Sequence, residues 1–178
     1  MMVEGNARPE AESPSIVPGR TGIVGLGLIG GSFARALAKG GREVYAYDPN
    51  EEITSFAAIE TTSGVLTDEL IGTCELIVLA CYPEACVAWL REHASLVNPD
   101  AIVIDTGGVK RSICEPCFEI ARESDITFIG CHPMAGTQFS GYAHSRANMF
   151  EGAPMVVCPA PEVRGVECLA LVDRLEGL

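Results

Sequence analysis

The sequence predicts a doubly wound α/β fold built around a mostly parallel β-sheet. Short apolar runs alternate with longer amphipathic stretches along the chain, as strands and helices do in this fold class. Several of the runs, including "ELIVLAC" at residue 75 and "AIVID" at residue 101, are almost continuous in Val, Ile and Leu. Such runs are typical of parallel strands that helices cover on both faces.

These two patterns also predict the individual elements. The candidate strands are "TGIVG" at 21, "EVYAYD" at 43, "GVL" at 64, "ELIVLAC" at 75, "AIVID" at 101, "ITFIGC" at 126 and "PMVVC" at 154. Helical periodicity predicts helices over residues 29–39, 51–58, 83–97, 110–123 and 162–176. A chain of 178 residues is expected to form one domain, which we place at residues 20–160.

The two ends of the chain lie outside this domain. Residues 1–19 contain acids and three prolines but no hydrophobic segment, which predicts a disordered leader and not a signal peptide. Residues 161–178 predict a C-terminal helix that runs to Gly177. A helix that ends in glycine usually precedes another element, so we expect the chain to be truncated there.

Composition excludes some classes of partner. The chain carries 24 acidic and 12 basic residues, a net charge of -12. Nucleic acids and anionic membrane surfaces both need a basic face, so we expect neither as a partner. No apolar run reaches the roughly 20 residues that span a bilayer. We therefore expect a cytoplasmic protein that acts on a small molecule.

Cysteine is frequent in this chain. The eight cysteines are at positions 74, 81, 86, 114, 117, 131, 158 and 168. Most lie in apolar runs, and without a secretion signal they are expected to be reduced thiols that fill the core. Cys114 and Cys117 have the spacing of a metal or redox motif, but no second pair completes the four ligands of a structural zinc site. We expect no metal.

A glycine-rich turn carries the clearest chemical signal. In "GIVGLGLIGGSFARAL", Gly25, Gly27 and Gly30 form a GxGxxG pattern between a predicted strand and a predicted helix. The first glycine allows a tight turn, the second lets the backbone approach a pyrophosphate, and the third lets helix and strand pack closely. The helix N-terminus, with Leu28 and Ile29, then faces the phosphates. This pattern predicts a Rossmann-type dinucleotide-binding domain.

Asp48 completes the pattern. It ends the next strand, 23 residues after Gly25, where an acid is expected to bind a ribose 2′-hydroxyl. A carboxylate repels a 2′-phosphate, and "DPNEEITS" contains no Arg or Lys to bind one. NAD is therefore favoured over NADP as the cofactor. The alternative is a glycine-rich turn beside an unrelated surface aspartate.

Further cofactor contacts are expected where the next two strands end. Ala80 and Cys81 end one strand, and Thr106 and Gly107 follow the next. Ligands of doubly wound sheets bind at the carboxyl ends of the strands, where small residues let a cofactor lie close. For Ala80 and Cys81, a simple strand-to-helix turn with Pro83 near the helix start is a compatible interpretation.

Gly108 and Lys110 belong to the same segment and are candidates for substrate binding. Lys110 could hold an anionic substrate or be an ordinary solvated helix residue, and the pattern favours neither. His132 follows "ITFIGC", so it lies at the end of the sixth strand, where Pro133 is expected to stop that strand. From position alone it is more often a structural histidine. Beside a nicotinamide, however, it would be a plausible base for alcohol oxidation.

Four segments together resemble one enzyme family. "GIVGLGLIGGSFARAL", "YAYD", "DTGGVK" and "GCHPMAGTQFSGYAHSRANMFEG" are similar to prephenate dehydrogenases and their arogenate-using relatives, from about residue 20 onward. The resemblance implies oxidative decarboxylation of prephenate to 4-hydroxyphenylpyruvate in tyrosine biosynthesis. It also implies that His132 accepts a hydrogen bond from the ring hydroxyl and helps to remove its proton, and that Thr137 lies near the substrate.

The chain departs from this family in two ways. The family usually has a serine where Gly108 stands, so Thr106, Ser112 or a water would have to supply that hydroxyl. The family also continues into a last strand and an α-helical domain, which forms a homodimer and binds the substrate carboxylates. That helical dimerisation domain is absent here, so we expect this chain to be the nucleotide-binding part.

Two other interpretations stay open. One is another nicotinamide-dependent oxidoreductase of the hydroxyacid dehydrogenase type, which would carry a lysine base in its helical domain. The other is a truncated, non-catalytic NAD-binding module. The residues also do not distinguish prephenate from arogenate as the substrate.

Overall fold

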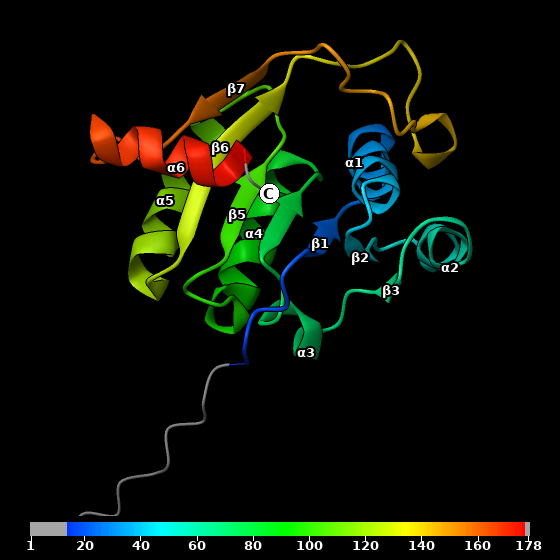
Figure 1. Cartoon of the computed structure of the whole chain (residues 1–178), viewed down its shortest axis with the longest axis horizontal. Coiled ribbons are helices and arrows are strands. Elements are labelled where there is room, and N and C mark those ends of the chain that lie inside the picture. Colours follow the sequence, from blue (N-terminus) through cyan, green and yellow to red (C-terminus); the bar gives the residue numbers. More distant parts are fainter. Residues whose placement is uncertain (1–13, 177–178) are drawn as a thin grey trace, which may run out of the picture.

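The computed structural model describes residues 14–176 and confirms the doubly wound α/β fold (Figure 1). One seven-stranded sheet has the order β3-β2-β1-β4-β5-β6-β7. Neighbouring strands are parallel except β6 and β7, which are antiparallel. The strands are β1 (Arg20–Val24), β2 (Glu43–Tyr47), β3 (Gly64–Val65), β4 (Leu76–Leu79), β5 (Ile102–Asp105), β6 (Thr127–Pro133) and β7 (Met155–Cys158).

The helices follow the predicted order with small differences. They are α1 (Leu28–Lys39), α2 (Glu51–Glu60), α3 (Asp68–Ile71), α4 (Pro83–His93), α5 (Arg111–Ser124) and α6 (Val166–Glu176). The helix predicted at 162–176 begins only at Val166, because Gly165 has the left-handed φ of 59° and breaks the preceding segment. None of the helices within residues 14–176 is long and apolar enough to cross a membrane.

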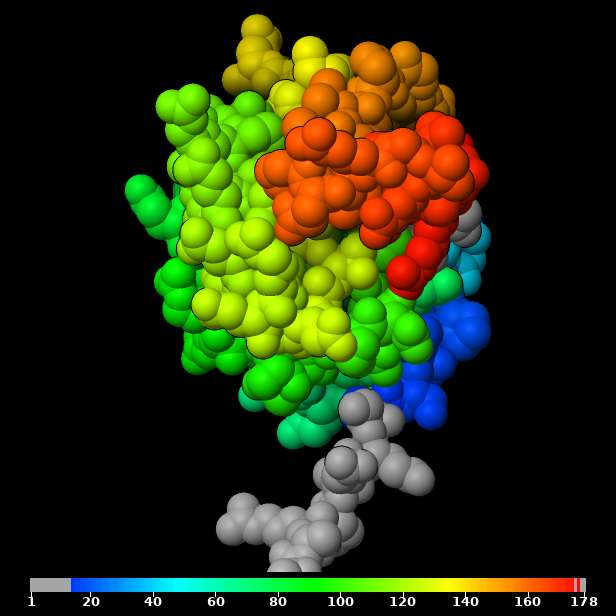
Figure 2. All heavy atoms as spheres, turned by 90° about the vertical axis from the view of Figure 1, so that its left-hand side faces the viewer, coloured from blue at the N-terminus to red at the C-terminus, as the bar shows by residue number. Residues whose placement is uncertain are grey.

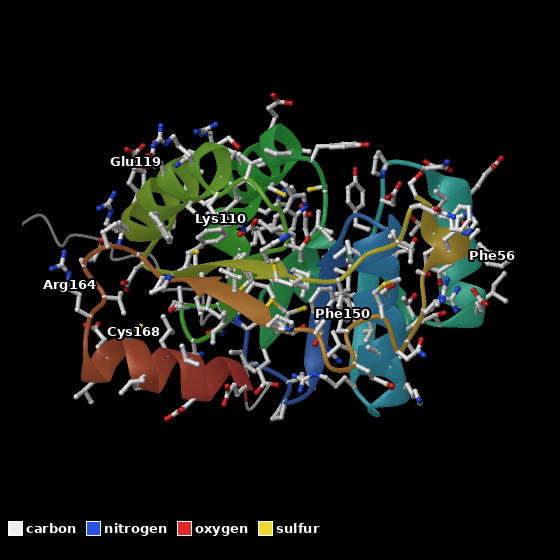
Figure 3. The ribbon with its side chains drawn as sticks, turned by 90° about the horizontal axis from the view of Figure 1, so that it is seen from above. Phe56, Lys110, Glu119, Phe150, Arg164 and Cys168 are labelled. Atoms are coloured by element: carbon white, nitrogen blue, oxygen red, sulfur yellow. The ribbon has the colours of Figure 1, made fainter. Side chains whose placement is uncertain are left out.

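Helices cover both faces of the sheet. On one face, α4 and α5 bury Trp89, Leu90 and Ile113 against the strands. On the other face, α1 and α2 contribute Ala34 and Ala57, and Leu171 of α6 packs against the same core. Seen from above, α5 and α6 lie on opposite sides of β6 and β7 (Figure 3). The two apolar cores explain why the strand sequences are apolar throughout.

The strand register brings the ends of the central strands together. Val24 of β1 pairs with Leu79 of β4, and Leu79 pairs with Asp105 of β5. The residues that follow these strands therefore emerge side by side at one edge of the sheet. This carboxyl edge, formed by the segments after β1, β4 and β5 together with the end of β6, is where ligands bind in doubly wound folds.

β6 ends at Pro133, where the sequence predicts that the strand stops. The strand includes Pro133, and Met134 still donates a backbone hydrogen bond to Pro154. Hydrogen-bonded pairs alternate along an antiparallel ladder, so Pro133 occupies a position that faces away from β7. It also lies beyond the residues of β6 that pair with β5. A missing N–H costs nothing at such a position.

The predicted leader extends into residues that contact the domain. Asn98 donates a side-chain hydrogen bond to the carbonyl of Pro14, at 2.8 Å. Val17 donates its backbone N–H to Thr73. Residues 14–19 thus lie against the segments that precede β4 and β5. The rest of the predicted leader, residues 1–13, lies outside the described residues.

An apolar groove of about 390 Å³ lies between α5, the start of β6 and α6. Phe118, Phe128 and Leu171 are among the residues that line it. Figure 2 shows the surface hollowed between α6 and α5. The groove is at the opposite end of β6 from His132, so it is separate from the carboxyl edge.

Candidate nucleotide-binding and catalytic site

A different structural constraint explains the glycine at each of the three positions of the GxGxxG turn. Gly25 has a φ of 95°, and a Cβ there would lie 2.8 Å from the carbonyl oxygen of Ala80. A Cβ on Gly30 would overlap the carbonyl oxygen of Gly25, so only glycine lets α1 start this close to β1. A Cβ on Gly27 would meet nothing within 4 Å. Gly27 therefore faces open space, where a ligand can reach the backbone.

The first turn of α1 is available to an anion. Gly27 is the N-cap residue and offers no side chain to the free N–H groups, and the first turn contains no acid. Leu28 and Ile29, which form this turn, are half-buried. Free N–H groups and the positive end of the helix dipole favour a phosphate at such a site.

Asp48 is held beside the glycine-rich turn by two backbone donors. Its Oδ2 accepts a hydrogen bond from Leu26 N at 2.8 Å, and its Oδ1 accepts one from Asn50 N at 2.9 Å. These bonds fix the carboxylate at the end of β2 and leave lone pairs for further donors. No Arg or Lys occurs in residues 47–60, so the local charge is negative.

Ala80, Cys81, Thr106 and Gly107 lie along the same edge, as predicted. The backbone of Ala80 donates to Val24 at 2.7 Å, and that of Thr106 donates to Leu79 at 3.2 Å. The hydroxyl of Thr106 points back toward the sheet and donates to Leu79 O. The backbone carbonyl of Thr106, and not its hydroxyl, faces His132.

His132 is oriented by that carbonyl. Its Nδ1 lies 3.1 Å from Thr106 O. A carbonyl oxygen only accepts, so Nδ1 carries the proton and donates it, and Nε2 keeps a lone pair. A Cβ on Gly108 would lie 3.4 Å from Cε1 of His132, so Gly108 flanks the ring and leaves the space beside it open.

Lys110 is engaged in a way that neither predicted alternative described. Its Nζ lies 2.5 Å from Oδ2 of Asp105 and 2.6 Å from the carbonyl oxygen of Cys131. Figure 3 shows Lys110 on the α5 side of β6. The ammonium group is thus held by the protein itself, while 20% of the side chain stays exposed. It forms an ion pair with Asp105 and a hydrogen bond to β6, the strand that carries His132.

Asp105 is the partner that sequence reasoning missed. Its side chain is fully buried and accepts from Gly107 N at 2.8 Å and from Cys131 N at 3.1 Å, besides Lys110. One carboxylate therefore joins the end of β5, the 107–110 segment and β6. An acid that ends the apolar run "AIVID" was the signal that could have identified it.

Thr137 lies in the segment that follows β6. Its hydroxyl donates to Phe139 O and accepts from Phe139 N at 3.2 Å, within an exposed turn. The chain then returns to α1, where Arg146 N donates to Ser32 Oγ and the rings of Phe150 and Phe33 pack at a tilt of 37° with centroids 4.5 Å apart. Figure 3 shows Phe150 beside α1. A Cβ on Gly31 would lie 2.7 Å from Tyr142 and 2.8 Å from Ser145, so glycine lets the 142–145 segment pack against α1. The doubled glycine in the sequence was the signal for this contact.

A family model and several curated relatives identify the same family. Residues 33–176 match the family model described as prephenate dehydrogenase, nucleotide-binding domain. Prephenate dehydrogenase of Bacillus subtilis is 30% identical over 164 residues, which are 87% of this chain and 43% of that protein. Cyclohexadienyl dehydrogenase of Zymomonas mobilis is 29% identical over 142 residues, covering 77% of this chain and 48% of that protein. The chain thus spans about half the length of these relatives.

Solved structures give the same result. Arogenate dehydrogenase from Synechocystis superposes with a TM-score of 0.77 at 29% identity, over 89% of this chain and 56% of that one. Prephenate dehydrogenase from Aquifex aeolicus, in complex with hydroxyphenyl propionate and NAD+, superposes with a TM-score of 0.69 at 26% identity. That match covers 94% of this chain and 58% of the other.

Proposed function

The chain belongs to the prephenate dehydrogenase family, as its nucleotide-binding domain, and on that premise we propose that it binds NAD along the carboxyl edge of the sheet and supplies the base of the reaction. The proposed reaction is the oxidative decarboxylation of prephenate or arogenate, in tyrosine biosynthesis. The observation that carries this proposal is the hydrogen bond from His132 Nδ1 to Thr106 O, because it leaves Nε2 free beside the nucleotide edge.

The residues present fit a dinucleotide. The open backbone at Gly27 and the free N–H groups of α1 suit a pyrophosphate, and Asp48 suits a ribose. Ala80, Cys81, Thr106 and Gly107 would then line the nicotinamide half. When bound, NAD supplies the acceptor for the hydride. The lack of Arg and Lys in residues 47–60, which flank Asp48 in the sequence, supports NAD over NADP.

The protein's own part in the chemistry is to take a proton. Nε2 of His132 would accept the hydrogen bond of the substrate's ring hydroxyl and remove its proton as the C–O bond gains carbonyl character. Loss of carbon dioxide leaves the ring aromatic. Because Nδ1 stays bonded to Thr106 O, the imidazole keeps its orientation and its charge is stabilised while it holds the proton.

The Lys110–Asp105 pair supports this geometry without touching a substrate. Asp105 holds Cys131 N and Lys110 holds Cys131 O, so both backbone groups that precede His132 are fixed. The same pair fixes the segment that contains Thr106 and Gly108. A base whose partner and backbone are both tied to one buried carboxylate is pre-organised for proton transfer.

Cofactor choice can be tested on the chain itself. Titration should show tighter binding of NAD than of NADP, and Asp48→Ser should narrow the gap by about tenfold, the effect of one charge-assisted hydrogen bond. Glu51→Ser, an exposed acid in the first turn of α2, serves as the control and should leave the ratio unchanged. Equal or tighter NADP binding by the unmodified chain would contradict the assignment of Asp48.

The role of His132 is tested in the whole protein that contains this chain. His132→Asn should lower turnover by roughly 100- to 10,000-fold, the usual contribution of a general base, with NAD affinity unchanged. His144→Asn alters an exposed histidine stacked on Phe139 and is the matched control. If both variants retain full turnover, His132 has only a structural role.

A further inference from the structure

Two thiols meet at the carboxyl edge of the sheet. Sγ of Cys81, two residues after β4, lies 3.3 Å from Sγ of Cys86 in the first turns of α4. This distance is that of an S–H···S hydrogen bond. A disulfide bond is about 2.05 Å long, so the two sulfurs would have to approach by about 1.3 Å to form one.

The two sulfurs have different surroundings. Cys81 is partly exposed at the edge, whereas Cys86 is fully buried and also donates to Cys81 O at 3.3 Å. The hydrogen bond from the Cys81 thiol lowers the pKa of Cys86 and raises that of Cys81. Cys86 is thus the thiol that ionises more easily, whereas Cys81 is the one that solvent reaches. The hydrogen bond between the two sulfurs lets a proton pass from one to the other.

The sequence motif with redox spacing has neither property. Cys114 and Cys117 both lie on the buried face of α5. Burial raises the pKa of Cys114 to about 11 and that of Cys117 to about 12. Sγ of Cys114 fills the space left by the missing Cβ of Gly130. These thiols are packing residues, and they provide a control inside the same molecule.

We propose that Cys81 and Cys86 are an oxidation site that hydroperoxides convert into a disulfide at the rim of the nucleotide site. Cys81, the partly exposed sulfur, attacks one oxygen of the peroxide as its thiolate, which forms an S–O bond and breaks the O–O bond. The leaving oxygen takes up a proton and departs as water from hydrogen peroxide, or as an alcohol from an alkyl hydroperoxide. The second sulfur then attacks the resulting sulfenic acid, which forms the S–S bond, breaks the S–O bond and releases water. The two thiols together lose two protons and two electrons, and the hydroperoxide is reduced.

The position of Cys81 connects this site to the nucleotide. A Cβ on Gly25 would lie 3.1 Å from Cys81 N, so Cys81 touches the first glycine of the GxGxxG turn. A nucleotide bound at this edge would cover the exposed thiol, and by linkage the disulfide would weaken nucleotide binding. This second step rests on the proposed function, whereas the disulfide itself does not.

The first test uses hydrogen peroxide on the reduced chain. Intact mass spectrometry should show the loss of two hydrogens, reversed by dithiothreitol, and peptide mapping should identify a Cys81–Cys86 crosslink. Cys81→Ser and Cys86→Ala should each abolish the crosslink, and the Cys114→Ala/Cys117→Ala variant should keep it. Mapping of the unmodified chain needs no variant, so a folding defect cannot obscure the result. Oxidation without this crosslink, or a crosslink between other cysteines only, would overturn the proposal.

The second test adds NAD before the peroxide. At ten times its dissociation constant, NAD should slow crosslinking by about tenfold, because only the free fraction reacts. The Cys81–Cys86 crosslink forming at the same rate with and without bound NAD would refute the link to the nucleotide. If NAD does not bind in a parallel titration, the proposed function fails instead, and the crosslink measured without NAD still decides the oxidation site.

Discussion

At the scale of single residues, the buried carboxylate of Asp105 connects three segments of the chain. A buried carboxylate is destabilising unless charges and donors compensate it. Here Lys110 supplies the charge, and two backbone N–H groups supply further hydrogen bonds. The pair therefore adds little net stability, but it fixes how β5, β6 and the segment between them are arranged.

Removing one partner of this pair should be costly. Lys110→Met leaves the fully buried Asp105 without its counter-charge and is expected to lower the free energy of unfolding by about 3 to 5 kcal/mol, measured by urea denaturation. Lys39→Met, on an exposed lysine at the end of α1, should change it by less than about 0.5 kcal/mol.

A double-mutant cycle separates the charge from the packing. Asp105→Asn in the Lys110→Met background removes the uncompensated charge and should recover part of the lost stability. If Lys110→Met is as stable as the unmodified chain, the ion pair does not hold the three segments together.

At the scale of elements, the β1–α1 turn separates folding from binding. Gly30→Ala places a Cβ against the carbonyl of Gly25 and should destabilise the fold by about 1 to 3 kcal/mol. Gly27→Ala meets nothing in the chain, so the thermal midpoint should stay while NAD affinity falls. Differential scanning fluorimetry and NAD titration on both variants measure the two effects. Equal losses of stability in the two variants would show that both glycines serve packing alone.

Much of this architecture could be predicted because its signals are local. Apolar runs gave the strands, and the glycine spacing with Asp48 gave the nucleotide turn. Three elements escaped or shifted for a physical reason. The four-residue α3 and the turn at 142–144 are too short for a periodic pattern, and Gly165 delays the start of α6.

The rest of the site depends on register, which local patterns do not contain. Lys110 meets Cys131 only because β5 and β6 pair as they do, with Ile104 opposite Ile129. The thiol pair shows the same limit. Spacing pointed to Cys114 and Cys117, whereas the fold of the β4–α4 turn brings Cys81 and Cys86 together.

At the scale of the whole molecule, buried thiols make stability depend on pH. Burial raises the pKa of Cys74, Cys117 and Cys131 to about 12 each. In the unfolded chain these thiols titrate near about 8.5. Because the folded-state pKa values are the higher ones, this stabilising contribution is complete below about pH 8.5 and is lost as pH rises toward 12.

Urea denaturation at pH 8, 9, 10 and 11 should therefore show a falling free energy of unfolding. Cys74→Ala removes one titrating group and should make the fall less steep by up to about 1.4 kcal/mol per pH unit. Cys168→Ala, on a partly exposed cysteine of α6, is the control. An unchanged slope in Cys74→Ala would mean that this thiol is not protected in the folded state.

The return of the chain to α1 has a consequence for biosynthesis. Ser32 bonds to a residue 114 positions later, and Arg35 bonds to one 110 positions later. At about 5 to 20 residues per second, translation leaves the outer face of α1 uncovered for roughly 6 to 23 s. During that interval the nascent chain exposes Phe33 and Gly31, which residues 142–150 later cover. The helix that the glycine-rich turn opens is thus synthesised well before the segment that covers it.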